Sequence, residues 1–383
     1  MPWNTSYPVE DRRNFISEWI LQDRPVANLC LEHGISRKTG HKWIQRYREQ
    51  GLSGLEALSQ APYRPFNTTP KIIEKAIVSL RGQHPHWGPR KILHRLSRIS
   101  PEIRWPAAST MGAILKRNGL SAPRKRMIKA PIRQTPLQAG KETNDVWAAD
   151  FMGWFRTRDG RRIDPLTVTD WASRYLIGCH GMEYPSFQNV RTRFELLFRK
   201  FGLPRTIRTD NGAPFAGAGL GGLSRLSVWW IRLGILPERI RPAHPEENGR
   251  HERMHRTMRA ATAAPPRLNF RAQQTRFSAF QREFNEERPH EALGMRTPAE
   301  IYRASDRPYP TRLPEIEYGS DYHVRRVHSR GQIKWAGHLL FISDSLVGQA
   351  VGLQQIDDRL WGIHFGPIVL GVLDEKTLTI RRV

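Results

Sequence analysis

Three carboxylates in the second half of the chain have the types and spacing that metal-dependent chemistry needs. Asp150 lies within residues 146–154, a run typical of a strand, and Asp210 ends a later run of the same kind, before an Asn-Gly turn. Glu252 follows the segment that starts at Pro245 and leads into a helix rich in arginine and histidine. Mg²⁺ and Mn²⁺ prefer carboxylate oxygens as ligands. Two strands and a helix that brought these side chains together could therefore hold a pair of such ions.

The charge of the chain suggests what such a site would act on. Two divalent ions about 3.5–4 Å apart can stabilise both the attacking and the leaving oxygen of a phosphoryl transfer. The net charge of +25 and the isoelectric point near 10.9 favour a polyanionic partner, and arginine dominates the basic residues. We therefore expect an enzyme that cuts and joins DNA. On charge alone, a merely soluble basic protein is the alternative.

Cysteine usage and hydropathy restrict the compartment. The two cysteines, Cys30 and Cys179, cannot supply a disulfide framework or a cysteine zinc site. The first residues lack the apolar centre of a signal peptide, and the sequence has no run of 18 apolar residues. We expect a protein with no membrane partner and a cytoplasmic location.

The first fifty residues predict three short helices. Phe15 and Trp19 mark the apolar face of the first, Pro25 can open the second, and Ser36 is a favourable N-cap for the third, residues 37–49. The third helix would turn basic side chains outward, which is typical of a helix-turn-helix whose last helix enters the major groove. The predicted DNA contacts are Arg37, Lys38, Thr39, His41, Lys42, Gln45 and Arg46. A three-helix bundle with a solvated basic face is the alternative.

A second helical unit follows with the same organisation. Apolar residues recur at helical spacing over residues 72–80 and 92–96, and Ser109 could cap a third helix that ends at Asn118. Two helix-turn-helix units in tandem would read a longer DNA site than one. The basic residues at its end and in the proline-bearing segment beyond it add Lys116, Arg117, Arg124, Lys125 and Arg126 to the predicted DNA contacts. A simple solvated linker explains that segment equally well.

From Asp145 onward the pattern changes to strands. Two strands follow the one that carries Asp150, and a helix over residues 186–201 precedes the strand of Asp210. The elements expected after Asp210 are a flexible glycine-rich insert (216–222), a helix (226–233), a last strand (239–243), the helix of Glu252 and a helix over 271–287. Three meandering strands followed by alternating helices and strands predict a ribonuclease-H-like α/β fold.

The C-terminal part alternates in the manner of short strands. Residues 333–335, 351–353 and 361–365 mark three of them, separated by turns with glycine or aspartate, and suggest a small SH3-like β-barrel. The expected fold class is therefore multidomain, with all-α helix-turn-helix units, a central α/β core and a C-terminal all-β barrel. The expected divisions are 1–62 and 63–120 (helix-turn-helix domains), 121–144 (basic linker), 145–305 (catalytic core), 306–320 (linker) and 321–383 (barrel).

Several motifs together resemble one known family. They are Trp147-Ala-Ala-Asp150, Thr209-Asp210-Asn-Gly212, Asn248-Gly-Arg-His-Glu252, Phe284-Asn-Glu-Glu-Arg-Pro-His-Glu-Ala-Leu293 and Thr297-Pro-Ala-Glu300. With these motifs the chain resembles, over nearly its whole length, the bacterial insertion-sequence transposases of the retroviral-integrase superfamily, which carry a DDE catalytic core. One departure is the gap of 41 residues between Asp210 and Glu252 (252 − 210 − 1), which is longer than is usual in that family. The glycine-rich insert accounts for the extra length.

The resemblance implies a reaction, a cofactor and partners. It implies that Asp150, Asp210 and Glu252 are the catalytic metal ligands and that each site binds two ions, Mg²⁺ or Mn²⁺. It implies hydrolysis of a phosphodiester at each end of a mobile element and joining of the freed 3′-hydroxyls to target DNA. The implied partners are double-stranded DNA, both element ends and target, and further copies of the chain in a homo-oligomer on that DNA. The implied location is the nucleoid of a bacterium.

Two other functions fit parts of the same sequence. His251-Glu-Arg-Met-His255 matches the H-E-x-x-H pattern of zinc metalloproteases, in which Glu252 would be a general base, but this leaves Asp150 and Asp210 unexplained. A DNA-binding repressor with a catalytically silent core is the other alternative, and metal-dependent nicking would distinguish it from a transposase. Among the competing carboxylates, we expect Asp170 to anchor a hairpin and Glu247 to favour the start of the Glu252 helix.

Overall fold

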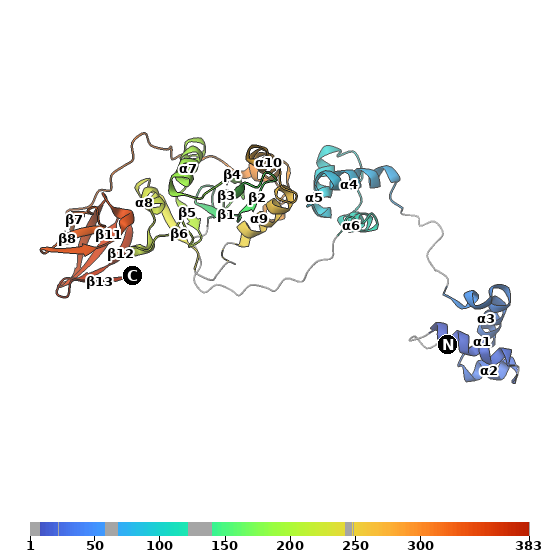
Figure 1. Cartoon of the computed structure of the whole chain (residues 1–383). Coiled ribbons are helices and arrows are strands. Elements are labelled where there is room, and N and C mark those ends of the chain that lie inside the picture. Colours follow the sequence, from blue (N-terminus) through green and yellow to red (C-terminus); the bar gives the residue numbers. More distant parts are fainter. Residues whose placement is uncertain are drawn as a thin grey trace. The chain divides into compact units, whose positions relative to one another are not determined.

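The helices and strands fall into two units of the chain. The computed structural model describes residues 8–21, 23–57, 68–121, 140–241, 247 and 249–382 (Figure 1). It divides into Met1–Pro70 and Lys71–Val383, and each unit is described by itself. The predicted contacts Arg124, Lys125 and Arg126 lie outside the described residues. The finer division into six segments remains a prediction.

The first unit contains the three helices that the sequence predicts. They are α1 (Pro8–Ile20), α2 (Val26–Glu32) and α3 (Arg37–Gln50), and a short 3₁₀ turn, η1 (Gly51–Leu55), follows. Ser36 caps α3 by accepting a 3.2 Å hydrogen bond from the backbone N–H of Thr39. Gly51 ends the helix with a φ of 64°, a conformation that glycine adopts without strain. Phe15, Leu29, Trp43, Ile44 and Leu55 are buried together and hold the three helices in place.

The second unit begins with another three-helix cluster. Its helices are α4 (Lys71–Gln83), α5 (Pro89–Ile99) and α6 (Ala108–Arg117), packed around Ile77, Trp87, Ile92 and Ile114. Pro89 stands at the first position of α5, as expected. The prediction that Ser109 caps α6 is wrong, because the N-cap is Ala107 and Ser109 lies inside the first turn. Alanine favours helix strongly enough for α6 to start early without a side-chain cap.

A mixed sheet forms the centre of the second unit. Its strands are β1 (Val146–Phe151), β2 (Phe155–Arg156), β3 (Arg162–Asp170), β4 (Leu176–Met182), β5 (Thr206–Thr209) and β6 (Leu236–Arg239). The order is β4–β3–β1–β5–β6, with the short β2 beside the start of β3. The pairs β4–β3 and β3–β1 are antiparallel, whereas β1–β5 and β5–β6 are parallel. This is the meander followed by parallel strands that the ribonuclease-H-like prediction requires.

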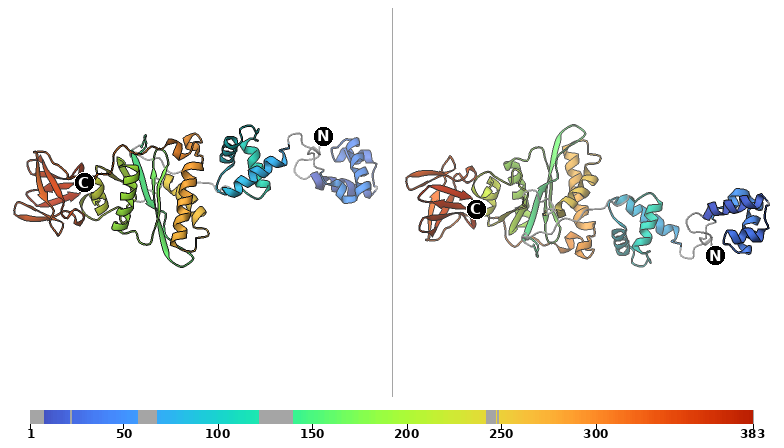
Figure 2. Two further views of the ribbon diagram at one scale, coloured as in Figure 1. Left: turned by 90° about the horizontal axis from the view of Figure 1, so that it is seen from above. Right: turned by 90° about the horizontal axis from the view of Figure 1, so that it is seen from below.

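Helices cover both faces of this sheet, as the two views of Figure 2 show. One face packs against α7 (Phe187–Phe201) and α8 (Arg225–Arg232), with Trp147, Phe198 and Trp230 at its centre. The other face packs against α9 (Gly249–Thr262) and α10 (Phe270–Arg282), where Met254 and Phe277 are buried. The sheet is therefore a rigid middle layer, and side chains at the end of β1 can reach α9.

Two elements after Asp210 differ from the sequence prediction. The last strand, expected at 239–243, is β6 at Leu236–Arg239, where it pairs in parallel with β5. Pro237 hides this strand from pattern analysis, although a proline is tolerated at the edge of a sheet. The helix expected over 271–287 ends at Arg282 and continues as one wider π-helical turn, Glu283–Glu287. Such turns often mark functional positions.

The C-terminal part is all β. Its strands are β7 (Tyr322–Arg326), β8 (Gln332–Trp335), β9 (His338–Phe341), β10 (Ala350–Asp357), β11 (Leu360–Phe365), β12 (Ile368–Asp374) and β13 (Thr379–Arg382). An antiparallel sheet, β13–β12–β11–β10–β7, and the hairpin β8–β9 share one apolar core. Leu220 of the glycine-rich insert and Leu223, just after it, belong to that core, and the N–H of Leu220 donates a 3.1 Å hydrogen bond to the carbonyl of Ile342. The insert is thus packed against the C-terminal sheets, which corrects the prediction of a flexible segment.

Candidate catalytic site

Asp150 and Asp210 lie at the same end of two neighbouring parallel strands. The register of β1 and β5 pairs Val146 with Thr206 and Ala148 with Arg208. Asp150 is two residues beyond Ala148 and Asp210 is two residues beyond Arg208 (150 − 148 and 210 − 208), so continuing the register brings both to one level. The sequence predicts Asp150 inside a strand and Asp210 at the end of another, whereas the structure ends β1 at Phe151, just after Asp150, and pairs the two strands side by side.

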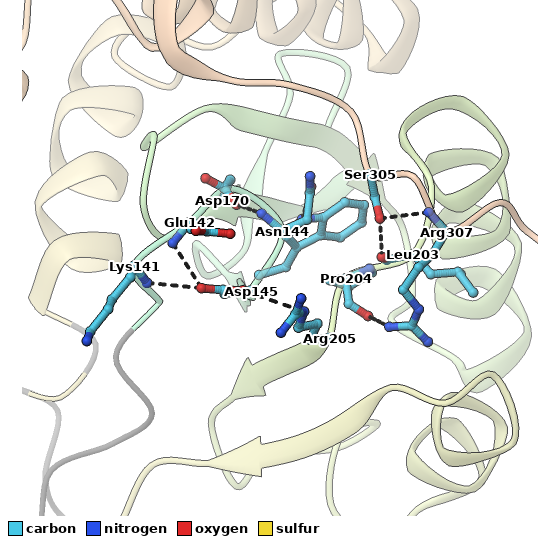
Figure 3. A network of polar contacts seen from close by, with 11 residues as sticks. Lys141, Glu142, Asn144, Asp145, Asp170, Leu203, Pro204, Arg205, Ser305 and Arg307 are labelled. Carbon is cyan, nitrogen blue, oxygen red and sulfur yellow. Dashed lines mark hydrogen bonds and ion pairs between the residues drawn. The ribbon is translucent and has the colours of Figure 1, made fainter.

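A polar network at the opposite end of the two strands fixes their register (Figure 3). The carbonyl of Asn144 accepts a 2.9 Å hydrogen bond from the N–H of Arg205, and that of Asp145 accepts a 3.0 Å bond from the N–H of Thr206. The Asp145 carboxylate accepts two further bonds, from the backbone N–H groups of Lys141 and Glu142. A slip of β1 against β5 by one residue would break these bonds. The network therefore also fixes the position of Asp150 relative to Asp210 along the paired strands.

The segment after the core tightens the same end of the sheet. The guanidinium of Arg307 donates a 2.8 Å hydrogen bond to the carbonyl of Pro204, and the hydroxyl of Ser305 donates a 2.7 Å bond to that of Leu203 (Figure 3). Asp170 accepts a 2.7 Å bond from the N–H of Asn144 and bonds from Ser173, so it anchors the β3–β4 turn as the sequence analysis expected.

The side chain of Asp150 faces α9, the helix of Glu252. Side chains alternate along β1, so Trp147 and Ala149 join the core on the α7 side and Asp150 points the other way. Nδ1 of His255 lies 3.9 Å from Oδ2 of Asp150, and the side chains are 11% and 17% exposed. The carboxylate is therefore held at the edge of a largely water-excluded interface between strand and helix.

One hydroxyl joins both histidines of α9 to the sheet. Oγ1 of Thr167 lies 2.6 Å from Nε2 of His251 and 2.7 Å from Nε2 of His255, and it donates to the carbonyl of Asp150 at 3.1 Å. A hydroxyl has one proton and two lone pairs, so these three partners saturate it when each imidazole donates its Nε2–H. Thr169 Oγ1 can then donate to Nδ1 of His251, 3.3 Å away. All of these groups are satisfied by one arrangement of protons.

Burial keeps both imidazoles neutral. Desolvation, with a smaller contribution from Arg259, lowers the pKa of His255 to about 4. Desolvation and the neighbouring His255 place the pKa of His251 well below its ordinary value. Because both Nε2 atoms meet at the Thr167 hydroxyl, the H-E-x-x-H pattern here secures a helix to a sheet, and its geometry does not suit the zinc site of a protease.

The turn after β5 explains the Asn-Gly pair that follows Asp210. Oδ1 of Asp210 accepts a 3.2 Å hydrogen bond from the N–H of Gly212, and the amide of Asn211 donates a 2.7 Å bond to the carbonyl of Ile240. A Cβ atom at Gly212 would lie 3.0 Å from Oδ2 of Asp210, so a larger residue there would crowd the carboxylate. The glycine therefore keeps space around Asp210, and Asn211 ties the turn to the end of β6.

Glu252 lies in the first turn of α9 with an exposed side chain. It precedes His255 by three residues, so both occupy the same side of the helix, and His255 faces Asp150. Within the described residues, no three His, Cys, Asp or Glu side chains are close enough together to hold a metal ion. Three carboxylates are nonetheless the ligand type that Mg²⁺ or Mn²⁺ takes, and the donor set fits those ions rather than zinc.

The predicted DNA contacts of the first unit lie mainly on the surface of α3. Arg37, Lys38, His41, Lys42 and Gln45 are exposed, and Thr39 and Arg46 are half-buried. Two of the basic side chains lie over the ring of Trp43, Lys42 at 5.4 Å and Arg46 at 4.7 Å. In the second unit Lys116 and Arg117 are exposed at the end of α6, and Arg117 forms a salt bridge with Glu74. Arg117 is thus already paired, whereas the α3 residues form one exposed basic face.

Sequence analysis missed several residues around this site. Thr167 carries no local signal, since its partners are 84 and 88 residues away along the chain. The buried carboxylate of Glu247 forms an ion pair with the partly exposed Arg241, 2.7 Å apart, in addition to any effect on the start of α9. Arg174 and Arg288 line a cavity beside α9, and the sequence hinted at them only through the motif Glu287-Arg-Pro-His290 and the turn after Asp170.

Comparison with known protein families confirms the helix-turn-helix and core predictions. A helix-turn-helix domain model matches residues 11–66, and a homeodomain-like domain model matches residues 39–115. Two integrase core domain models match residues 140–245 and 233–298, which together span β1, β5 and α9. The chain thus carries helix-turn-helix domains and an integrase core domain, and its relatives are proteins of insertion elements, transposases among them.

Individual relatives of the chain come from bacterial insertion elements. It is 27% identical over 293 residues to the 39.2 kDa protein of insertion element IS476 from Xanthomonas euvesicatoria, which covers 74% of this chain and 80% of that protein. It is 27% identical over 236 residues to the transposase InsD of insertion element IS2A/D/F/H/I/K from Escherichia coli, covering 58% and 75%. A chain of the simian T-cell lymphotropic virus intasome in complex with PP2A regulatory subunit B56 gamma aligns at a TM-score of 0.37 and 15% identity. The alignment covers 76% of this chain and 97% of the intasome chain.

None of the helices in the part of the chain that the structure describes is both long enough and apolar enough to span a bilayer.

Proposed function

We propose that the protein is a catalytically active DNA transposase in which Asp150, Asp210 and Glu252 are the catalytic carboxylates. The observation that carries this proposal is the register of β1 and β5. It places Asp150 and Asp210 side by side at the same end of two neighbouring parallel strands. Glu252 shares a side of α9 with His255, the residue that faces Asp150. The three carboxylates would hold two Mg²⁺ or Mn²⁺ ions, which would supply charge stabilisation at the reacting phosphorus.

Other side chains of the core act by positioning. The hydroxyl of Thr167 and the two α9 histidines hold the helix against β3 and the backbone of Asp150. Arg259, one turn further along α9, donates a 2.7 Å hydrogen bond to the carbonyl of Met152 just beyond β1. The contact between α9 and the sheet therefore includes hydrogen bonds at both of its ends, at Thr167 and at Met152. Such contacts fix the carboxylates more tightly than apolar packing alone, and phosphoryl transfer depends on this kind of positioning.

The proposed chemistry consists of two substitutions at phosphorus. In the first, a water oxygen forms a bond to the phosphorus at each element end, the bond to the bridging 3′-oxygen breaks, and that oxygen leaves as a 3′-hydroxyl. In the second, this hydroxyl attacks a phosphodiester of target DNA and displaces a second 3′-oxygen. Neither step needs a covalent bond to the protein.

The proposed partners follow from the charge and from the two helical clusters. The exposed basic face of α3 would enter the major groove of the element end, and the second cluster would read an adjacent part of the site. The six-part domain division, a homo-oligomer that holds two ends, and a location at the nucleoid belong to the same proposal. Since many arginines would contact phosphates, we expect DNA affinity to fall steeply with salt.

Cleavage and joining of labelled DNA carrying the element ends would test this function. Wild type, Asp210→Asn and the control Asp358→Asn would be compared with Mg²⁺ or Mn²⁺. Asp358 is exposed in the turn between β10 and β11, so its substitution removes the same charge away from the core. We expect cleaved and joined products from wild type and the control, and at least a hundredfold less from Asp210→Asn. Specific, salt-sensitive binding without products from any of them would identify a repressor instead.

A further inference from the structure

A basic cavity lies beside α9, away from the proposed catalytic carboxylates. Its volume is about 320 Å³, and Trp171, Met254 and Phe284 supply much of its apolar lining. The charged and imidazole side chains that argue for a ligand are Lys91, Arg174, Arg250, Arg253, Arg288 and His290. Arg174, Arg288 and His290 are half-buried, whereas Arg250 and Arg253 are exposed, so positive charge extends from the surface into the cavity.

Helix geometry separates this cavity from the carboxylate site. Successive residues of an α-helix are about 100° apart around its axis. Arg250, Arg253 and Thr257 therefore share one flank of α9, and all three line the cavity. Glu252 and Arg259 lie on the other flank, where Arg259 bonds the backbone at the end of β1. The helix α9 therefore separates the cavity from the proposed catalytic carboxylates.

The positive charge of the cavity is not neutralised by the carboxylates that line it. Within the described part of the chain, the structure contains no salt bridge to Arg174, Arg250, Arg253 or Arg288. Of the acidic residues in the lining, Asp170 already accepts bonds from Asn144 and Ser173, and Glu291 pairs with Arg90. Glu283, which attracts Arg288, is itself bonded to His84. A mobile anion would compensate the remaining charge.

Three polar atoms of the lining are buried without a hydrogen-bond partner in the described structure. They are Nε of Arg174, Nε of Arg288 and Nε2 of His290. A buried donor without an acceptor costs free energy, and the two arginine Nε–H groups in one cavity indicate a ligand that would accept their hydrogen bonds. Burial lowers the pKa of Lys91 to about 8, the nearby Arg288 lowers it further, and Glu291 opposes the shift.

The backbone at Arg174 supports a role for its side chain. Arg174 has a φ of 62°, a left-handed conformation that glycine adopts without strain and that costs other residues free energy. Glycine would therefore suit the β3–β4 turn better if only the turn mattered. An arginine there places a guanidinium against the cavity despite that cost.

We propose that this cavity is a phosphate-binding pocket. Arginine forks match the oxygens of a phosphate in charge and in geometry, and Arg250 is held in place by stacking on Trp171 at 4.2 Å. The phosphate belongs either to the backbone of DNA lying across α9 or to a small phosphate-bearing molecule. The first source rests on the proposed DNA function, whereas the pocket itself does not.

Thermal unfolding of the full chain with inorganic phosphate tests the pocket directly. Phosphate would be compared with chloride at constant ionic strength, for wild type, Arg174→Gly and the control Arg271→Gln. Arg174→Gly removes the guanidinium and relieves the backbone strain, so the variant folds. Arg271 is exposed on α10 and does not line the cavity. We expect phosphate to raise the melting temperature of wild type and control, and the increase to be lost in Arg174→Gly.

The salt dependence of DNA binding by the same three proteins distinguishes the two sources. Loss of one phosphate contact reduces the slope of log affinity against log salt by about 0.9. If the slope is reduced in Arg174→Gly but not in the control, the pocket binds the DNA backbone. If the slope is unchanged while phosphate no longer raises the melting temperature of Arg174→Gly, the pocket binds a small phosphate-bearing molecule. An equal phosphate response in wild type and Arg174→Gly would overturn the proposal. No readout uses cleavage, so this failure differs from failure of the proposed catalysis.

Discussion

The imidazole of His255 stands between Asp150 and Thr167, with Nδ1 3.9 Å from the Asp150 carboxylate and Nε2 2.7 Å from the Thr167 hydroxyl. The hydrogen bond at Nε2 fixes the helix of Glu252 against Thr167 on β3, and the Thr167 hydroxyl in turn donates to the backbone carbonyl of Asp150. An apolar contact alone would tolerate rotation of α9, because Met254 and Met258 can pack in several ways. The geometry of the proposed catalytic site therefore depends on a threonine that bears no charge.

Replacing Thr167 with valine should destabilise the protein although the side-chain shape is kept. Two buried imidazole N–H groups and one carbonyl would lose their partner, and each unsatisfied group of this kind costs about 1–3 kcal/mol. Allowing for relaxation, we expect a loss of about 2 kcal/mol in the free energy of unfolding, measured with urea. The control is Thr275→Val on the exposed side of α10, which should change stability by less than about 0.5 kcal/mol. Equal effects would show that Thr167 does not hold α9.

The ion pair next to Asp210 should matter far more than a comparable pair on the surface. Nε of Arg208 lies 2.7 Å from Glu238, with the side chains 2% and 21% exposed, and the guanidinium also lies over Trp171. Glu238→Gln would leave a buried guanidinium opposite a neutral amide, at a cost of about 2 kcal/mol. Glu195→Gln removes the partner of Arg199 on the surface of α7 and should cost less than about 0.5 kcal/mol. Urea unfolding of both variants measures the contrast, and equal losses would refute it.

Local signals in the sequence predicted most of the helices. Ser36 and Ser186 cap α3 and α7, and Pro89 opens α5, because each of these effects depends on residues a few positions apart. The motif aspartates were also found locally, since each ends or follows a short apolar strand. Residue spacing thus predicts elements where neighbours along the chain decide the outcome, whereas the common level of Asp150 and Asp210 follows from the pairing of β1 with β5.

Contacts between distant parts of the chain were not predictable in this way. The glycine-rich segment was expected to be flexible from its composition, yet Leu220 and Leu223 complete the core of the C-terminal sheets. The strand β6 was placed too late because Pro237 breaks the usual strand pattern, while its pairing with β5 is tertiary. The basic cavity combines Arg174 with Arg288, which are 114 residues apart (288 − 174), and no local pattern connects them.

Acidification should destabilise the protein partly through His180 on β4. Burial, with a smaller effect of Arg193, lowers the pKa of His180 from 6.5 to about 4. The unfolded chain therefore binds a proton first as the pH falls. The stabilisation by the neutral imidazole is complete above about pH 6.5 and is lost as the pH falls towards 4.

The variant His180→Gln isolates this contribution. Between pH 7 and pH 4.5, wild type should lose on the order of 2 kcal/mol more unfolding free energy than the variant. The control is His338→Gln at an exposed position, which should lose as much unfolding free energy over this pH range as wild type. Urea unfolding at both pH values provides the measurement, and parallel losses in wild type and His180→Gln would contradict the assignment.

The attachment of the segment after Asp210 to the C-terminal sheets should depend on Gly219. A Cβ atom there would lie 2.5 Å from Cβ of Ser343 and 3.1 Å from its Cα, so Gly219→Ala must push the insert away from the sheets. Overpacking of this kind costs about 1–3 kcal/mol. Gly82→Ala is the control, because its Cβ would meet no atom within 4 Å and α4 should gain about 0.5–1 kcal/mol. Both shifts can be measured by thermal unfolding. A neutral Gly219→Ala would mean that the insert gives way without loss, and that the C-terminal sheets do not restrain the segment that follows Asp210.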